Sequence, residues 1–187
     1  FKMVKIYEID GTEKKEKSTL EKKISIYNES PLLNSGKLYR AIAAKIKNKK
    51  IKINDKNKIV EAAKKLSKAD INSKYLFETG IDSIASKISA RKYLRDELKA
   101  YQKSFPRIYG KGKKFTIIEG RDIGTEIFPE AKYKIFLWAD AKMRAMRRYK
   151  QTQKKGEKAR LAQIYNEIII RDYKDLNRKI APLRPAV

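Results

Sequence analysis

The pattern of apolar and polar residues along the chain predicts several strands. Residues 2–9 alternate in the way of a half-buried strand and are followed by Asp10-Gly11, a turn signal. Residues 115–118 and 133–138 are compact apolar runs, which are typical of parallel strands buried on both faces. We therefore expect three strands widely separated in the sequence.

Helices are predicted between these strands. Apolar residues recur at helical spacing over residues 17–27, 38–46, 59–66, 84–105, 142–154 and 161–171. Pro31 ends the first of these helices, and residues 47–58 form a Lys/Asn-rich stretch with little core potential. Strands separated by helices predict an α/β fold with a parallel sheet flanked by helices. A length of 187 residues suits one domain with a real core.

The charge balance changes this picture. Lys plus Arg is 47 and Asp plus Glu is 22, giving a formal net charge of +25. A small enzyme gains nothing from this self-repulsion, whereas a protein bound to phosphate backbones does. We therefore expect RNA as a partner, with a solubility surface or codon bias as the alternative. The candidate RNA contacts are lysines with little acidic relief nearby: Lys45, Lys47, Lys49, Lys50, Lys52, Lys111, Lys113 and Lys114.

Two chemically useful residue types are absent. The chain has no cysteine, so it has no disulfide and no thiolate nucleophile. It has no histidine, so it lacks the commonest general base. Any catalysis must use carboxylates, Lys, Arg, hydroxyls and backbone N–H groups, and no protein metal site is expected. No apolar run approaches the ~18 residues that cross a bilayer, so no membrane partner is expected. The chain begins at Phe1, so we expect any targeting peptide to have been removed.

A damaged phosphate-binding loop follows the first predicted strand. Residues 11–18 read Gly-Thr-Glu-Lys-Lys-Glu-Lys-Ser, the frame G-x-x-x-x-G-K-[ST] with Glu16 in place of the second glycine. That glycine lets backbone N–H groups close around phosphates. A Glu adds a side chain and a negative charge, at a cost on the order of several kcal/mol in a partly desolvated site. Taken alone, this segment is better interpreted as a lysine-rich turn.

Further motifs carry a family resemblance. They are Gly120-Arg-Asp-Ile-Gly-Thr125, Arg147-Arg-Tyr-Lys-Gln151 and Arg171-Asp-Tyr-Lys-Asp175-Leu-Asn-Arg178. In order and spacing they resemble the bacterial-type cytidylate (CMP) kinase family, which has the P-loop nucleoside monophosphate kinase fold. Asn34-Ser-Gly-Lys-Leu-Tyr39-Arg40 is similar to the family segment D-T-G-x-x-Y-R. The resemblance is dense from about residue 115 to the end of the chain.

The resemblance implies a role for each matching residue. The catalytic positions would be Lys17, Arg147, Arg148 and Arg171. The ATP phosphate loop would contain Gly11, Glu16, Lys17, Ser18 and Thr19, with the Ser18 hydroxyl on the magnesium side. The CMP-binding positions would be Tyr39, Arg40, Ser86, Arg95, Arg121, Asp122, Asp175 and Arg178. Without the resemblance, the acids and arginines of 171–178 would be interpreted as ion pairs on a helix surface.

The chain also departs from the family pattern. The phosphate loop lacks its second glycine, and the segment between Asp55 and Ser86 is shorter than the family's nucleotide-binding insert. Asn34 stands where the family segment has Asp, and the carboxylate before Gly120 is Glu119, a mild change. The chain stops at Val187, before the family's last strand and helix. We expect one cytidylate-kinase-like domain over 1–187. Its core would be 1–33 and 106–187, with a reduced nucleotide-binding segment over 34–105.

These departures lead to a functional hypothesis. Because they fall on the ATP site, the insert and the C-terminal edge, while the acceptor-site arginines are retained, they predict a catalytically inactive pseudoenzyme that needs no cofactor. It would be a basic RNA-binding subunit of a ribonucleoprotein, most simply a mitochondrial ribosome, with rRNA and neighbouring proteins as partners. The alternative is an active, divergent kinase that transfers phosphate from ATP to CMP or dCMP with Mg²⁺. A third hypothesis is a nucleotide-sensing regulator that binds CMP at the retained acceptor site.

Overall fold

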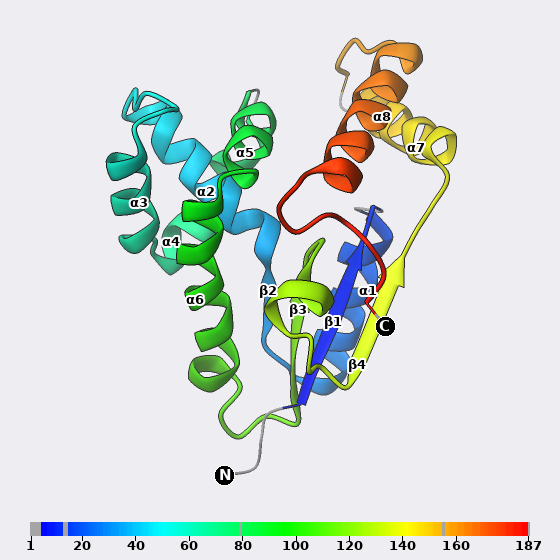
Figure 1. Cartoon of the computed structure of the whole chain (residues 1–187). Helices are drawn as coiled ribbons and strands as arrows, with labels where there is room; N and C mark the ends of the chain where they lie inside the picture. Colours follow the sequence, from blue (N-terminus) through cyan, green and yellow to red (C-terminus); the bar gives the residue numbers. More distant parts are fainter. Residues whose placement is uncertain (1–4, 13–14, 79, 155, 187) are drawn as a thin grey trace.

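A four-stranded parallel sheet forms the centre of the computed structural model, which describes residues 5–12, 15–78, 80–154 and 156–186, excluding the side chains of residues 15–18. The strands are β1 (Lys5–Gly11), β2 (Leu32–Asn34), β3 (Phe115–Glu119) and β4 (Tyr133–Leu137), in the order β2-β3-β1-β4. Each pair is parallel. The expected α/β fold with a helix-flanked parallel sheet is confirmed (Figure 1).

Three groups of helices surround this sheet (Figure 1). The first is α1 (Lys15–Asn28), which covers one face. The second is a helical layer beside β2, and the third is an arm of two paired helices beyond the end of β4. The layer contains α2 (Ser35–Asn48), α3 (Lys56–Lys64), α4 (Lys68–Ile71), a 3₁₀ turn η1 (Lys74–Phe77), α5 (Ile81–Ser89) and α6 (Lys92–Tyr109). The arm is α7 (Ala141–Lys154) with α8 (Leu161–Asn177), and a π-helical turn η2 (Ile123–Ile127) follows β3.

The two faces of the sheet bury different side chains. Ile9 and Ile117 are fully buried with Phe115 on the face that packs against Leu20 and Ile24 of α1. On the opposite face, the buried Ile118 belongs to the larger core that also contains apolar residues of α2, α3, α5 and α6. Every residue of β3 is buried, which explains why its apolar residues are not confined to alternate positions.

The structure corrects some of the predicted elements. The single helix expected over 84–105 is two helices, α5 and α6, separated at Ala90–Arg91. Arg91 has the extended dihedrals φ −86°, ψ 117°, and no glycine or proline in the sequence marks this break. Arg95 Nη1 donates to the Ser89 carbonyl at 2.8 Å, so a side chain satisfies the free end of α5. The short strand β2 and the η2 turn were not predicted, and α8 extends six residues past the predicted end at Arg171.

The α7–α8 arm has a small core of its own. Ala145 of α7 packs with Ile164 and Ile168 of α8. Nη1 of Arg144 donates to Asp172 Oδ1 at 3.0 Å and Nη2 pairs with Oδ2, while Nε donates to the Ala139 carbonyl at 2.8 Å. This bidentate ion pair joins the two helices through side chains that are almost buried. In the described part of the chain, no helix combines the length and the apolar character that a bilayer crossing requires.

Candidate active site

A cavity of about 570 Å³ opens at the carboxyl ends of β2 and β3. Ligands of open parallel sheets bind at this edge, and the volume is in the range of small-molecule sites. Nine residues predicted from the sequence line it: Tyr39, Arg40, Ser86, Arg95, Arg121, Asp122, Arg171, Asp175 and Arg178. They come from α2, α5, α6, the β3–η2 segment and α8. The fold therefore brings all predicted CMP-binding residues into one cavity.

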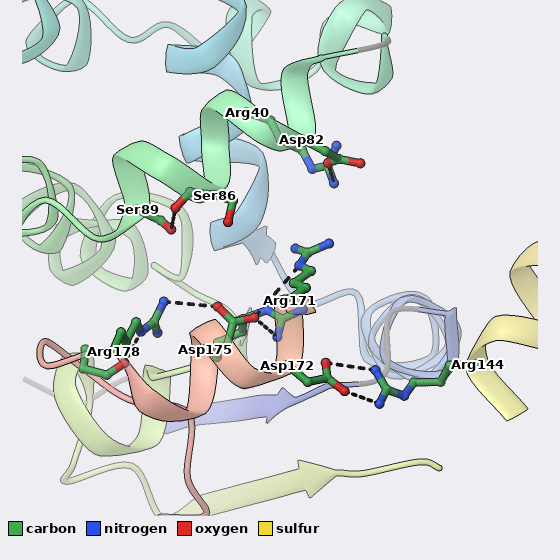
Figure 2. Close-up of polar contacts among 11 residues, drawn as sticks. Arg40, Asp82, Ser86, Ser89, Arg144, Arg171, Asp172, Asp175 and Arg178 are labelled. Carbon is green, nitrogen blue, oxygen red and sulfur yellow. Dashed lines mark hydrogen bonds and ion pairs between the residues drawn. The ribbon is translucent and has the colours of Figure 1, made fainter. Parts of the chain in front are cut away.

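A buried carboxylate organises three arginines on the α8 side of this cavity (Figure 2). Asp175 forms an ion pair with Arg121, lies 3.6 Å from Nη1 of Arg178 and 3.9 Å from Nε of Arg171. Burial and the positive charge of Arg171 lower the pKa of Arg121 to about 10. One carboxylate does not balance three guanidinium groups, so an anion entering the cavity would be stabilised by the excess positive charge.

Arg178 has a further donor to offer. Its Nε donates to the Ala181 carbonyl at 2.6 Å, which fixes the side chain. Its Nη2 is buried and has no hydrogen-bond partner among the described residues. Burial, followed by the charge of Arg95, lowers the pKa of Arg178. A fixed, buried donor without a protein partner is suited to a polar group of a ligand.

A second ion pair lies deeper, between α6 and the start of η2. Arg95 Nη2 pairs with Asp122, and both side chains are about nine-tenths buried. The Arg95 guanidinium lies 5.9 Å from the centre of the Tyr39 ring. Burial raises the pKa of Tyr39 to about 12, so its hydroxyl stays protonated near neutral pH and can donate a hydrogen bond. Ser86 of α5 also lines the cavity. Its backbone carbonyl accepts a hydrogen bond from Ser89 Oγ at 2.9 Å.

The sequence interpretation missed two elements of this site. Ser35 is buried and lines the cavity, and a Cβ atom on Gly120 would come within 2.6 Å of its Oγ. Gly120 therefore allows β3 to approach α2 closely. Asn34 Nδ2 donates to the Glu119 carboxylate, so two replacements that were noted separately are bonding partners. Ser35 stands inside the segment that resembles D-T-G-x-x-Y-R, and this match could have identified it.

The phosphate-loop residues are described only in part. The strand–loop–helix context is confirmed, because the loop lies between β1 and α1. Gly11 has φ +134°, and a Cβ atom there would overlap the Leu137 backbone, so glycine is required where β1 ends beside β4. Thr19 is exposed in the first turns of α1. The predicted roles of Glu16, Lys17 and Ser18 depend on side chains that lie outside the described residues, and stay predictions.

The remaining predicted residues lie away from the cavity lining. Arg147 and Arg148 of α7 are not among the lining residues, and Arg148 Nη2 is 3.3 Å from Glu167 of α8.

Among the candidate RNA contacts, Lys45 pairs with Asp70 at 2.8 Å, Lys47 with Glu78 at 3.4 Å and Lys113 with Glu29 at 3.7 Å. The stretch at the end of α2 and the α6–β3 loop lie at opposite ends of the molecule (Figure 1), so these lysines do not form one surface.

The Arg144–Asp172 pair gives a first prediction. Arg144→Lys keeps the charge and loses the bidentate geometry that joins α7 to α8, next to Arg171 of the cavity. We expect faster hydrogen exchange of the α7 amides and about a tenfold loss of any activity at this cavity. The control is Arg160→Lys at the exposed start of α8. Unchanged α7 exchange in the Arg144 variant would contradict this positioning role.

Comparisons with known proteins agree with this geometry. The family model described as Cytidylate kinase matches residues 7–187. The chain is similar to the cytidylate kinase of Rhodopseudomonas palustris, with 34% identity over 97% of this chain and 84% of the relative. The cytidylate kinase of Bartonella quintana is 35% identical over 95% of this chain and 81% of the relative. That of Rickettsia akari is 40% identical over 89% of this chain and 72% of the relative.

Proposed function

Since this chain belongs to the cytidylate kinase family, we propose that it is an active kinase that transfers a phosphate from ATP to CMP or dCMP. One observation carries this proposal beyond family membership. All of the predicted acceptor-site residues meet in one cavity, where three arginines surround the buried Asp175 and a fourth pairs with Asp122.

The prediction of an inactive, RNA-binding ribosomal subunit is wrong. Relatives at 34–40% identity over most of the chain are named cytidylate kinase, which supports the kinase reading instead. The prediction gave too much weight to the single residue Glu16 and to the net charge. RNA contact as such and a mitochondrial location stay predictions, because the names of these relatives concern neither.

The proposed reaction needs little covalent help from the protein. An oxygen of the CMP phosphate forms a bond to the γ-phosphorus of ATP, while the bond from that phosphorus to the β–γ bridging oxygen breaks and ADP leaves. The attacking oxygen is already ionised near neutral pH, so no general base is required. This chemistry requires positive charge around the transferring group and in-line placement. A chain without histidine or cysteine can supply both through arginines.

The Arg95–Asp122 pair suits recognition of a cytosine edge. Cytosine presents an amino group beside two acceptor atoms, so it requires an acceptor and a donor from the protein. Asp122 is an acceptor and Arg95 a donor, and both are held in fixed positions in the cavity wall. Uracil presents an oxygen where cytosine has its amino group, and that oxygen would face the buried Asp122 carboxylate. The proposed discrimination against UMP follows from this repulsion.

Magnesium, which the family implies, is compatible with the residues present. The described residues contain no cluster of three or more His, Cys, Asp or Glu that could hold a metal ion. Mg²⁺ needs no such cluster, because it is usually held by phosphate oxygens, water and one or two protein oxygens. The family match assigns the Ser18 hydroxyl to it, and carboxylates of Asp10 and Glu119 are at the same end of the sheet. When bound, the ion neutralises charge on the ATP phosphates.

The test is a product assay on the purified chain with ATP, CMP and MgCl₂. We expect ADP and CDP to form in equal amounts, as measured by ³¹P NMR, with UMP and AMP reacting at least about tenfold more slowly. Chelation of magnesium with EDTA is the control and should stop both products. ADP formation without CDP, or no turnover at millimolar CMP, would refute the proposed function.

A change in the phosphate loop gives a second prediction. Glu16→Gly removes a charge near the expected ATP phosphates, and at water-like screening one charge contributes about 1 kcal/mol. We therefore expect kcat/KM for ATP to rise by about fivefold or less, measured with CMP at saturation. If the variant instead raises ATP binding from undetectable to ordinary, the natural chain is not a working kinase.

A further inference from the structure

Arg40 lies opposite the Asp175 cluster, on the α2 side of the cavity. Its guanidinium is almost buried and makes three contacts. Nη1 donates to the Leu76 carbonyl at 3.2 Å, the charged group lies 5.0 Å from the centre of the Phe77 ring, and Nη2 pairs with Asp82. The first two contacts come from η1, and Asp82 is in the first turn of α5.

Arg40 also faces the arginines of the arm. Burial lowers the pKa of Arg40, and the positive charges of Arg171 and Arg148 lower it further, whereas Asp82 raises it. In Figure 2, the Arg171 side chain extends from α8 toward the Arg40–Asp82 pair across the cavity. Cations that approach from opposite walls mark the place where an anion is most stabilised. Among the described residues, the carboxylate that pairs with Arg40 is that of Asp82.

We propose that Asp82 is a built-in competitor of the acceptor phosphate, which must displace its carboxylate from Arg40 in order to bind. This inference rests on the proposed function, because it assumes a phosphate-bearing acceptor. It assigns to Asp82 a specificity-determining role. A phosphate dianion offers more charge to Arg40 than a carboxylate does, whereas a neutral nucleoside or a monoanion gains little from the exchange.

Asp82 is not needed to hold Arg40 in place. The Leu76 carbonyl and the Phe77 ring already fix the guanidinium from another element. The Asp82 side chain is 54% exposed, against 8% for Arg40, so the carboxylate can swing into solvent when a phosphate arrives. Because Asp82 is half exposed and Arg40 keeps its contacts with Leu76 and Phe77, loss of the carboxylate should cost less stability than breaking a fully buried pair. The carboxylate therefore affects ligand affinity more than the fold.

The test compares Asp82→Asn with the natural chain. The first measurement is calorimetric titration with CMP in the absence of ATP, and we expect about three- to fivefold tighter binding in the variant. The second is steady-state turnover with ATP, where KM for CMP should fall by a similar factor while kcat stays within about twofold. Asp82→Glu keeps the negative charge, so its affinity for CMP should equal that of the natural chain.

The matched control is Asp96→Asn. Asp96 forms an ion pair with Lys92 on α6 and has a similar exposure of 58%, but it does not line the cavity. It should leave CMP affinity unchanged. Weaker CMP binding by Asp82→Asn would overturn the inference, because Asp82 would then orient Arg40. Failure of the proposed function is separate: a natural chain that binds CMP but makes no CDP refutes the kinase and leaves the binding comparison intact.

Discussion

Arg171→Ala is expected to lower kcat for CDP formation by about 10³-fold while the melting temperature shifts by about 2 °C or less. Arg171 lines the cavity from α8, its side chain is 44% exposed, and its ion pair with Asp175 is loose, at 3.9 Å. Its loss leaves no buried charge without a partner, so the fold should tolerate the change. A cation that stabilises the transferring phosphate is worth several orders of magnitude in rate.

Two comparisons make this result specific. Arg171→Lys keeps the charge without the planar geometry and should recover part of the lost rate. Lys174→Ala removes an exposed cation from the same helix and should change kcat by less than about twofold. If Arg171→Ala and Lys174→Ala have equal effects on kcat, Arg171 has no role in the reaction.

Asp175→Ala should have the largest effect on stability. The carboxylate pairs with Arg121 and is close to Arg171 and Arg178, and removing it leaves these guanidinium groups near one another without the carboxylate that they share. Breaking a buried pair in this way costs about 3–5 kcal/mol. For a domain of this size, the melting temperature should fall by about 10 °C in differential scanning calorimetry.

The same change should remove the CMP site. Addition of CMP should raise the melting temperature of the natural chain and should not raise that of Asp175→Asn, which keeps the size of the side chain if the alanine variant is too unstable to purify. Glu167→Ala is the control, because its carboxylate pairs with Arg148 on the exposed side of the same helix and should contribute less than about 1 kcal/mol. An Asp175→Asn protein with natural stability and natural CMP protection would show that the cluster does not bind the acceptor.

The sequence pattern identified the long elements well. The strands at residues 115–118 and 133–138 were clear because they are compact and mainly apolar. β3 proved to be buried throughout, whereas β4 lies at the edge of the sheet and is only partly buried, so the prediction of burial on both faces was wrong for β4. The three-residue strand β2 was missed because so short a segment has no periodicity of its own. Its place depends on pairing with β3 and on the backbone bond from Ile117 N to the Pro31 carbonyl. The break between α5 and α6 was missed because no glycine or proline marks it, and the bond from Arg95 to the Ser89 carbonyl that satisfies the end of α5 has no sequence signature.

The candidate site was predicted unevenly for similar reasons. Motif matches supplied the residue types that meet in the cavity, including Arg95 and Asp175, because those motifs are long. Pairwise contacts were not predictable from separate motifs. Nothing in the sequence showed that Asp82 would pair with Arg40, or that Asn34 would pair with Glu119, since each pair joins distant segments of the chain.

The Asn34–Glu119 hydrogen bond constrains how these two positions can evolve. Asn34 offers an amide donor to Glu119, so an aspartate in its place would bring two carboxylates together near the floor of the cavity and raise the pKa of one of them. The effect of a substitution at position 34 on stability depends on which residue stands at position 119. The effects of substitutions at Asn34 and Glu119 on stability should therefore be non-additive.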